Sequence, residues 1–424
     1  MADICIFDVL VLSLPLIFLL LSLALLPLIC SKLWHKYELL IFACISVVSI
    51  ASFILTSRDK AIITLEKVIV DDYIPFIITL FTLYVLSHGI RIVVRFRPTT
   101  MVNLVFLGCG SVLSSIIGTT GASMLLLKPF LEMNKPRHKT SHLVIFFIFL
   151  ISNIGGLMTP LGDPPLLIGY LKGIDFLWEI ENLHSCWLMY LFSCLTILYF
   201  IDKRKLVTEK RLEGWRPIDE GSPIVISGML NVFLILTTVA ILFIDTIDVL
   251  SRNILLTVIC VISIIDGKRS GKTIDLGPFR EVLITFFVIF IVIAPVLHVL
   301  EVNSSSIHAK IAEWSSSVSE STIYFTMCAL ASSFLDNAPS YLLFFNMAGG
   351  NAQELMTTSA GVLKAISVSA VVMGSMTYIG NAPNMMVKSI AKRAGIEMPS
   401  FLGYIGWTMA IILPISIGVL LATR

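Results

Sequence analysis

Long apolar segments recur from one end of this sequence to the other, and they constrain the fold more than any other feature. A helix needs roughly 20 apolar residues to cross the hydrocarbon core of a bilayer. The runs 9–29, 39–55, 224–244 and 282–300 meet that length. Only 14% of the 424 residues are charged, against about 25% in an ordinary soluble domain. The chain is therefore predicted to be an all-α, polytopic membrane protein whose largest partner is the lipid bilayer.

Composition and motifs also argue against several function classes. The net charge of +2 provides no strong attraction to nucleic acid, and the eight cysteines form no CxxC pair, so a zinc or disulfide framework is not expected. No GxxxxGK[ST] loop, nucleophile elbow or zincin helix is present. We therefore expect neither an enzyme nor an ATP-driven pump, and no cofactor.

The apolar segments predict ten membrane crossings and two further segments that are broken near their middles by polar residues. The crossings are expected at residues 9–30, 38–56, 73–94, 143–171, 183–201, 223–244, 252–265, 280–300, 359–395 and 403–421. The broken segments are 101–133 and 321–348.

The distribution of basic residues predicts how these segments enter the membrane. Arg95 and Arg97 precede segment 101–133, and Lys135 and Lys139 follow it, so both of its ends belong on the cytoplasmic side. The segment is therefore predicted to be a re-entrant hairpin. By the same reasoning, 321–348 is predicted to be a hairpin entered from outside. We expect the protein to lie in a bacterial inner membrane with both termini outside the cytoplasm.

An internal repeat at a fixed offset of 218 residues relates the two halves of the chain. It matches Ser114-Ser115 with Ser332-Ser333, Gly156 with Gly374, Met158-Thr159 with Met376-Thr377, Gly162 with Gly380, and Pro165 with Pro383. Each half holds five crossings, an odd number, so the second half is expected to be inverted relative to the first. We expect one repeat at 1–201 with hairpin 101–133 and broken helix 143–171. A cytoplasmic linker follows at 202–222, and a second repeat at 223–424 has hairpin 321–348 and broken helix 359–395.

Each half contains two polar breaks that contain proline or glycine. They lie at 114–121 and 159–165 in the first half and at 333–339 and 377–383 in the second. Proline and glycine interrupt the helical hydrogen-bond ladder, and the freed backbone groups cannot face lipid. The four breaks are therefore predicted to surround a polar site inside the membrane.

Asp163 and Asp336 are the acidic residues at these breaks. A carboxylate at membrane depth costs roughly 2.5–3.5 kcal/mol on insertion scales, so such residues usually have a function. In the repeat, Asp163 corresponds to Asn381 and Asp336 to Gly118, so each half supplies one acid. Oxygen ligands of this kind suit Na⁺ or Li⁺ and allow a proton to compete. The alternative is that both acids only cap half-helices near an interface. Asn153 is either an ion ligand or a helix-packing residue.

Four runs at the breaks carry a resemblance to a known family. They are GTTGASMLLLKP, SNIGGLMTPLGDPPLLIGYLKGIDFLW, SSFLDNAPSYLLFFNMAGG and TYIGNAPNMMVKSIAKRAGIEMPSFLGY. They resemble the ion-transporter superfamily, with greatest similarity to its sodium/proton antiporters of the NhaD kind and its citrate transporters, over residues 75–420. The resemblance implies a scaffold domain and a transport domain that moves like an elevator within a homodimer. The site residues that it implies are Ser114, Thr119, Thr120, Asn153, Asp163, Ser333, Asp336, Asn337, Thr377 and Asn381. Thr159, from the break at 159–165, is a further candidate.

These features favour a secondary transporter that exchanges Na⁺ or Li⁺ for H⁺, with Asp163 and Asp336 binding either the metal ion or a proton. Uptake of citrate or another carboxylate with Na⁺ or H⁺ is the alternative. The hairpin tips read Gly-Thr-Thr and Asp-Asn-Ala where the dicarboxylate branch has Ser-Asn-Thr triplets, and Asp336 would repel an anion. No arginine lies at a tip. Efflux of arsenite or another oxyanion is a third possibility.

Overall fold

The computed structural model describes residues 6–208, 223–244, 246–269, 276–314 and 318–422, and this part of the chain is nearly all helical. The first half contains α1 (Ile6–Ile29), α2 (Ser31–Lys67), α3 (Ile74–Gly89), α4 (Thr100–Ile117), α5 (Thr119–Asn134), α6 (Ser141–Leu150), α7 (Pro164–Leu171) and α8 (Phe176–Thr208). The second half contains α9 (Met229–Leu242), α10 (Val249–Arg269), α11 (Gly277–Trp314), α12 (Glu320–Phe334), α13 (Asn337–Met347), α14 (Ala352–Thr357), α15 (Ala360–Met373), α16 (Ala382–Arg393) and α17 (Phe401–Ala422).

Seven helical segments in the described part of the chain are long and apolar enough to cross a membrane. They are Lys36–Arg58, Lys60–Gly89, Thr100–Ile117, Phe176–Val207, Val249–Arg269, Phe279–Leu300 and Phe401–Ala422. Shorter apolar helices lie at Val11–Leu23, Ser141–Leu157, Met229–Leu242 and Ala360–Met376. The protein is therefore a polytopic membrane protein. Without Thr100–Ile117, the long and short apolar helices together match the ten predicted crossings in position. That each of them crosses the membrane stays a prediction.

The expectation of an all-α fold is wrong at two short segments. Residues Arg91–Val94 form strand β1 and residues Ile224–Ser227 form strand β2, although the sequence predicted helix at both places. The strands pair antiparallel with Arg91 opposite Ser227. Both are rich in β-branched residues, which favour extended chain. Helix α9 begins only after Gly228, whose φ of +92° is left-handed.

Two other boundaries differ from the prediction. The second and third predicted crossings are joined by helix rather than by a loop. The backbone leaves helical geometry only at Ser57, and the π-helical turn η1 (Val68–Tyr73) leads directly into α3. The predicted linker begins as the last turns of α8, through Thr208, and its residues 209–222 lie outside the described part of the chain.

At the positions of both predicted hairpins, two packed helices are joined by a short turn, and their re-entrant course in the membrane stays a prediction. Helices α4 and α5 are joined through Gly118 alone, and α12 and α13 are joined through Leu335 and Asp336. Both predicted broken helices are interrupted as well. Helix α6 leads through the 3-10 turn η2 (Ile154–Leu157) to α7, and α15 leads through the 3-10 turn η4 (Gly374–Met376) to α16.

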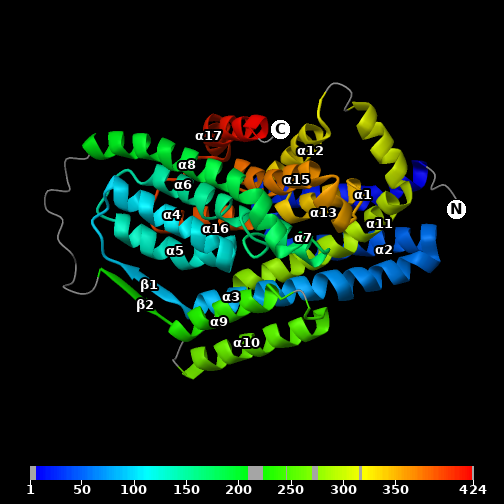
Figure 1. The fold of residues 1–424 in the computed structure, drawn as a ribbon, viewed down its shortest axis with the longest axis horizontal. Coiled ribbons are helices and arrows are strands. Elements are labelled where there is room, and N and C mark those ends of the chain that lie inside the picture. Colours follow the sequence, from blue (N-terminus) through cyan, green and yellow to red (C-terminus); the bar gives the residue numbers. More distant parts are fainter. Residues whose placement is uncertain (1–5, 209–222, 245, 270–275, 315–317, 423–424) are drawn as a thin grey trace.

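Corresponding helices in the two halves begin at positions that match the repeat. Helix α5 begins at Thr119 and α13 at Asn337, while α7 begins at Pro164 and α16 at Ala382. The halves interlock at these elements, because α7 packs against α13 and α16 packs against α5 (Figure 1). The hairpins and broken helices thus meet in the middle of the molecule, and α1, α2, α3, α9, α10 and α11 pack on one another beside them.

Candidate functional site

The tip of the first hairpin is held against the break that precedes α7. Gly118 adopts a φ of +82°, a left-handed conformation that glycine tolerates and other residues rarely adopt. A Cβ atom at this position would lie 3.3 Å from the carbonyl oxygen of Leu161. The next amide, of Thr119, donates a hydrogen bond of 2.8 Å to the carbonyl oxygen of Gly162. The sharp turn at Gly118 therefore places the Thr119 side chain beside Asp163.

A pair of glycines in each half brings the two sides of its break into contact. A Cβ atom on Gly156 would lie 3.0 Å from the carbonyl oxygen of Gly162 and 2.7 Å from Cβ of Asp163. In the second half, a Cβ atom on Gly380 would lie 2.6 Å from the carbonyl oxygen of Gly374. These two pairs are equivalent in the repeat. In both breaks the backbone segments approach this closely only because glycine has no side chain.

Asp163 lies where elements of both halves meet. Its side chain is 2% exposed. The Thr119 hydroxyl donates to Oδ1 at 2.5 Å, and the Asn337 amide donates to Oδ2. Asn381 Nδ2 lies 3.5 Å from Oδ1. None of the hydrogen-bond partners that the structure gives Asp163 is a basic side chain. Although Asp163 precedes α7, its side chain makes no capping hydrogen bond, so capping does not account for it.

Asn337 carries a buried oxygen that has no hydrogen-bond partner among the described residues. The side chain is fully buried, and its amide nitrogen is the donor to Asp163. Its Oδ1 atom is left without a donor. An orphaned buried carbonyl of this kind is costly, and it is a suitable ligand for a hard cation.

Three asparagines form a buried amide network behind Asp163. Asn381 donates to Oδ1 of Asn153 at 3.1 Å and to the carbonyl oxygen of Ser152 at 3.1 Å. Asn153 donates to Oδ1 of Asn384 and to the carbonyl oxygen of Ile148, both at 2.8 Å. These contacts fit the helix-packing interpretation of Asn153. Asn384 was missed from the sequence, although it stands in the same NAPN run as Asn381.

Four predicted site residues donate to backbone carbonyls instead of meeting Asp163. Thr159 donates to the carbonyl of Ser115, and its repeat equivalent Thr377 donates to that of Ser333 at 2.6 Å. Ser114 donates to Ile151 at 2.9 Å. The Ser333 hydroxyl donates to Ala329 at 2.7 Å. The hydroxyls of Thr159, Thr377 and Ser114 therefore join a hairpin to a break, whereas that of Ser333 bonds within α12.

Asp336 and Thr120 lie at the edge of the site. Asp336 is half-buried, and its carboxylate accepts from the amide of Ala338 at 3.5 Å, as the capping alternative predicted. It is close enough to Asp163 for the two carboxylates to interact electrostatically. Thr120 is half-buried at the other hairpin tip and takes no part in the contacts above.

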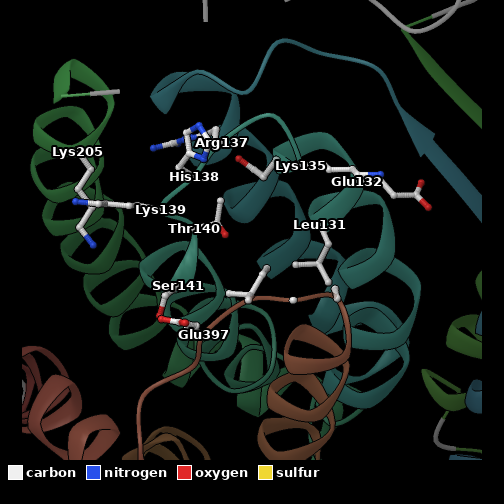
Figure 2. A pocket seen from close by; sticks show the side chains of 14 residues that line it. Leu131, Glu132, Lys135, Arg137, His138, Lys139, Thr140, Ser141, Lys205 and Glu397 are labelled. Atoms are coloured by element: carbon white, nitrogen blue, oxygen red, sulfur yellow. The ribbon is translucent and has the colours of Figure 1, made fainter. Parts of the chain in front are cut away.

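A cavity of about 800 Å³ with several basic side chains lies near the C-terminal ends of α5, α8 and α16 (Figure 2). None of the predicted site residues lines it. Its walls include Lys135, His138, Lys139, Lys205 and Glu397. Beside it is a buried charge cluster that sequence reasoning also missed. Within that cluster, Asp202 Oδ1 lies 2.7 Å from a guanidinium nitrogen of Arg137 and 2.9 Å from Nε2 of His142.

The fold and the site define a multi-pass membrane protein with a polar centre at breaks in buried helices, which is the class of secondary transporters. The chain belongs to the family described as "Putative citrate transport", whose model matches residues 8–423. The predicted resemblance to the citrate-transporter branch of the ion-transporter superfamily is thereby confirmed. Among curated proteins, none matches this sequence.

Proposed function

We propose that this transporter exchanges Na⁺ or Li⁺ for H⁺ and that Asp163 is the group for which the two ions compete. One observation carries the proposal: the Asp163 carboxylate is 2% exposed, and no basic side chain is among its hydrogen-bond partners in the described chain. A buried carboxylate without a counter-charge costs several kcal/mol. Either a metal cation or a proton would remove that cost.

The ligand set suits a small hard cation. Asp163 would supply a charged oxygen, Asn337 its unpartnered Oδ1 and Thr119 a hydroxyl oxygen. All are oxygen donors, as Na⁺ and Li⁺ prefer. Asp336 would act from the half-buried edge of the site, where its negative charge raises the local concentration of cations.

The proposed cycle uses the architecture predicted from the repeat. Two inverted halves would form ten crossings and two re-entrant hairpins, and they would carry the site across the membrane within a homodimer. Because Asp163 binds a proton or a cation but not both, one site couples the two opposite flows. The proposal places the protein in a bacterial inner membrane with both termini outside the cytoplasm.

Transport of citrate or another carboxylate, coupled to Na⁺ or H⁺, is the second candidate. The family description favours it, and so does the cavity with basic side chains, whose lysines would attract a polyanion. The contacts around Asp163 favour it less, because an anion would meet a carboxylate there without a basic side chain.

Proteoliposomes that are acidic inside test the two candidates directly. For exchange, external Na⁺ or Li⁺ raises the internal pH, K⁺ does so less, and Asp163→Asn abolishes the response. Asp175→Asn is the matched control, because Asp175 is an exposed acid shortly before α8. Uptake of labelled citrate with no Na⁺-linked proton movement would replace the first candidate with the second.

A further inference from the structure

Glu179 is another buried carboxyl group, and it lies outside all four breaks. It lies in the first turn of α8 and is 1% exposed. Neither of its carboxyl oxygens has a hydrogen-bond partner among the described residues. Glu181, two positions along the same helix, is exposed. Glu179 is therefore turned into the protein and away from water.

Tyr341 on α13 interacts electrostatically with Glu179. Tyr341 is fully buried, and its side chain also interacts with that of Ser367 on α15. The Tyr341 hydroxyl packs against Gly169 of α7, where a Cβ atom would overlap it. Tyr341 therefore contacts α7 and interacts electrostatically with the buried carboxyl group of α8.

No positive charge on the elements around Glu179 is directed at it in the described chain. Helices α4, α13 and α17 and the turn η2 contain no charged residue. Lys364 of α15 is directed at Cys186, about two turns further along α8. The remaining candidates are occupied elsewhere or exposed. His142 of α6 is bound to Asp202, Lys172 is paired with Asp72 at 2.6 Å, and Glu354 of α14 and His184 of α8 are exposed.

An ionised carboxylate in these surroundings would carry the full desolvation cost of a buried charge, several kcal/mol, without compensation. A proton on Glu179 would remove this cost. Water, or a group brought in by movement of α7 and α13, would be needed to stabilise its ionised form.

Helix α13 connects Glu179 to the Asp163 site. Asn337 and Tyr341 are four residues apart, so they lie on the same face of the helix. Asn337 donates to Asp163, and Tyr341 interacts electrostatically with Glu179. A shift of α13 when Asp163 exchanges its proton for a cation would change the surroundings of both carboxyl groups.

We propose that Glu179 is a second proton-binding site of the transport cycle. It carries a proton in the conformation described here and releases it to water when α7 and α13 move away from α8. This role rests on the proposed ion exchange. It adds one proton per cycle to the proton that Asp163 exchanges for a cation.

Infrared spectra and proton counting test this role with Glu179→Gln and the control Glu181→Gln. In the wild type at neutral pH, we expect a carbonyl band of a protonated, buried carboxyl group that Glu179→Gln removes and Glu181→Gln retains. In proteoliposomes, the number of protons moved per Na⁺ falls by about one in Glu179→Gln alone. Tyr341→Phe, which keeps the acid, shifts the frequency of the band without removing it.

Each contrary result has a distinct meaning. If the band survives in Glu179→Gln, or disappears without a change in the proton count, Glu179 is not a proton site of the cycle. A wild type with no Na⁺-linked proton movement would overturn both proposals. If Asp163→Asn abolishes exchange while Glu179→Gln behaves as wild type, the inference about Glu179 fails and the proposed function stands.

Discussion

Asn381 and Asp163 occupy equivalent positions in the two halves of the chain, and Nδ2 of Asn381 lies 3.5 Å from Oδ1 of Asp163. Thr119 and Asn337 form a second equivalent pair, and both donate to the same carboxylate. The two halves therefore meet at Asp163, and only one of the two matched positions is acidic. A site with one charged carboxylate at its centre is suited to one monovalent cation or one proton.

Asn381→Ala should weaken cation binding without unfolding the protein. The change removes the donor to Asp163, Asn153 and the carbonyl of Ser152. Loss of such hydrogen bonds costs about 1–3 kcal/mol, so the KM for Na⁺ should rise by at least about fivefold. Asn346→Ala, which removes a hydrogen bond within α13 at 2.8 Å, serves as the control. Equal KM values in the two variants would contradict the assignment.

Gly162→Ala and Gly380→Ala should each destabilise the protein strongly. At either position a methyl group would overlap the backbone of the facing glycine, and overpacking costs about 1–3 kcal/mol or more. Gly406 of α17 has open space around it, so Gly406→Ala should leave thermal stability in detergent unchanged or slightly raised. Similar melting temperatures for all three variants would argue against close contact at the breaks.

Arg137→Ala should lower thermal stability, because it leaves Asp202 buried beside His142 without its guanidinium partner. Removing one member of a buried ion pair costs about 3–5 kcal/mol. Lys135, which is exposed in the same loop, provides the control. Replacing Arg137 and Asp202 together with Met and Leu should restore part of the loss. A single variant as stable as Lys135→Ala would show that the cluster contributes little.

The apparent affinity for Na⁺ should fall as the pH falls. A proton on Asp163 excludes the cation, so acidification raises the KM for Na⁺, by at most about tenfold per pH unit if one proton competes. The maximal rate at saturating Na⁺ should change less than the KM does. Initial rates of exchange over a series of Na⁺ concentrations and pH values measure both. A KM independent of pH would mean that protons and Na⁺ bind at separate sites.

Much of the central architecture could be predicted because the repeat and the helix breaks contain glycine and proline, which have strong backbone preferences. The break at 114–121 predicted the turn at Gly118, and the runs at 159–165 and 377–383 predicted the starts of α7 and α16. The contacts of Asp163 with Asn337 and Asn381 were only implied, because they depend on how the two halves pack.

Other features could not be predicted for physical reasons. The strands at Arg91–Val94 and Ile224–Ser227 are short apolar runs whose pairing depends on residues far apart in sequence. Nothing in the sequence distinguishes Glu179 from its acidic neighbours Asp175 and Glu181. The structure buries Glu179 and exposes the other two. Arg137 stands between Lys135 and Lys139 in a basic loop, and its buried contact with Asp202 depends on how the end of α8 packs against that loop.

Proton release on cation binding tests the central claim most directly. Na⁺ is added to purified wild-type protein in a weakly buffered solution near neutral pH, and the protons released are counted. The account predicts that Na⁺ or Li⁺, but not K⁺ to the same extent, displaces protons from the wild type and that Asp163→Asn releases fewer, while Asp175→Asn matches the wild type. Equal proton release from wild type and Asp163→Asn would contradict competition at this carboxylate.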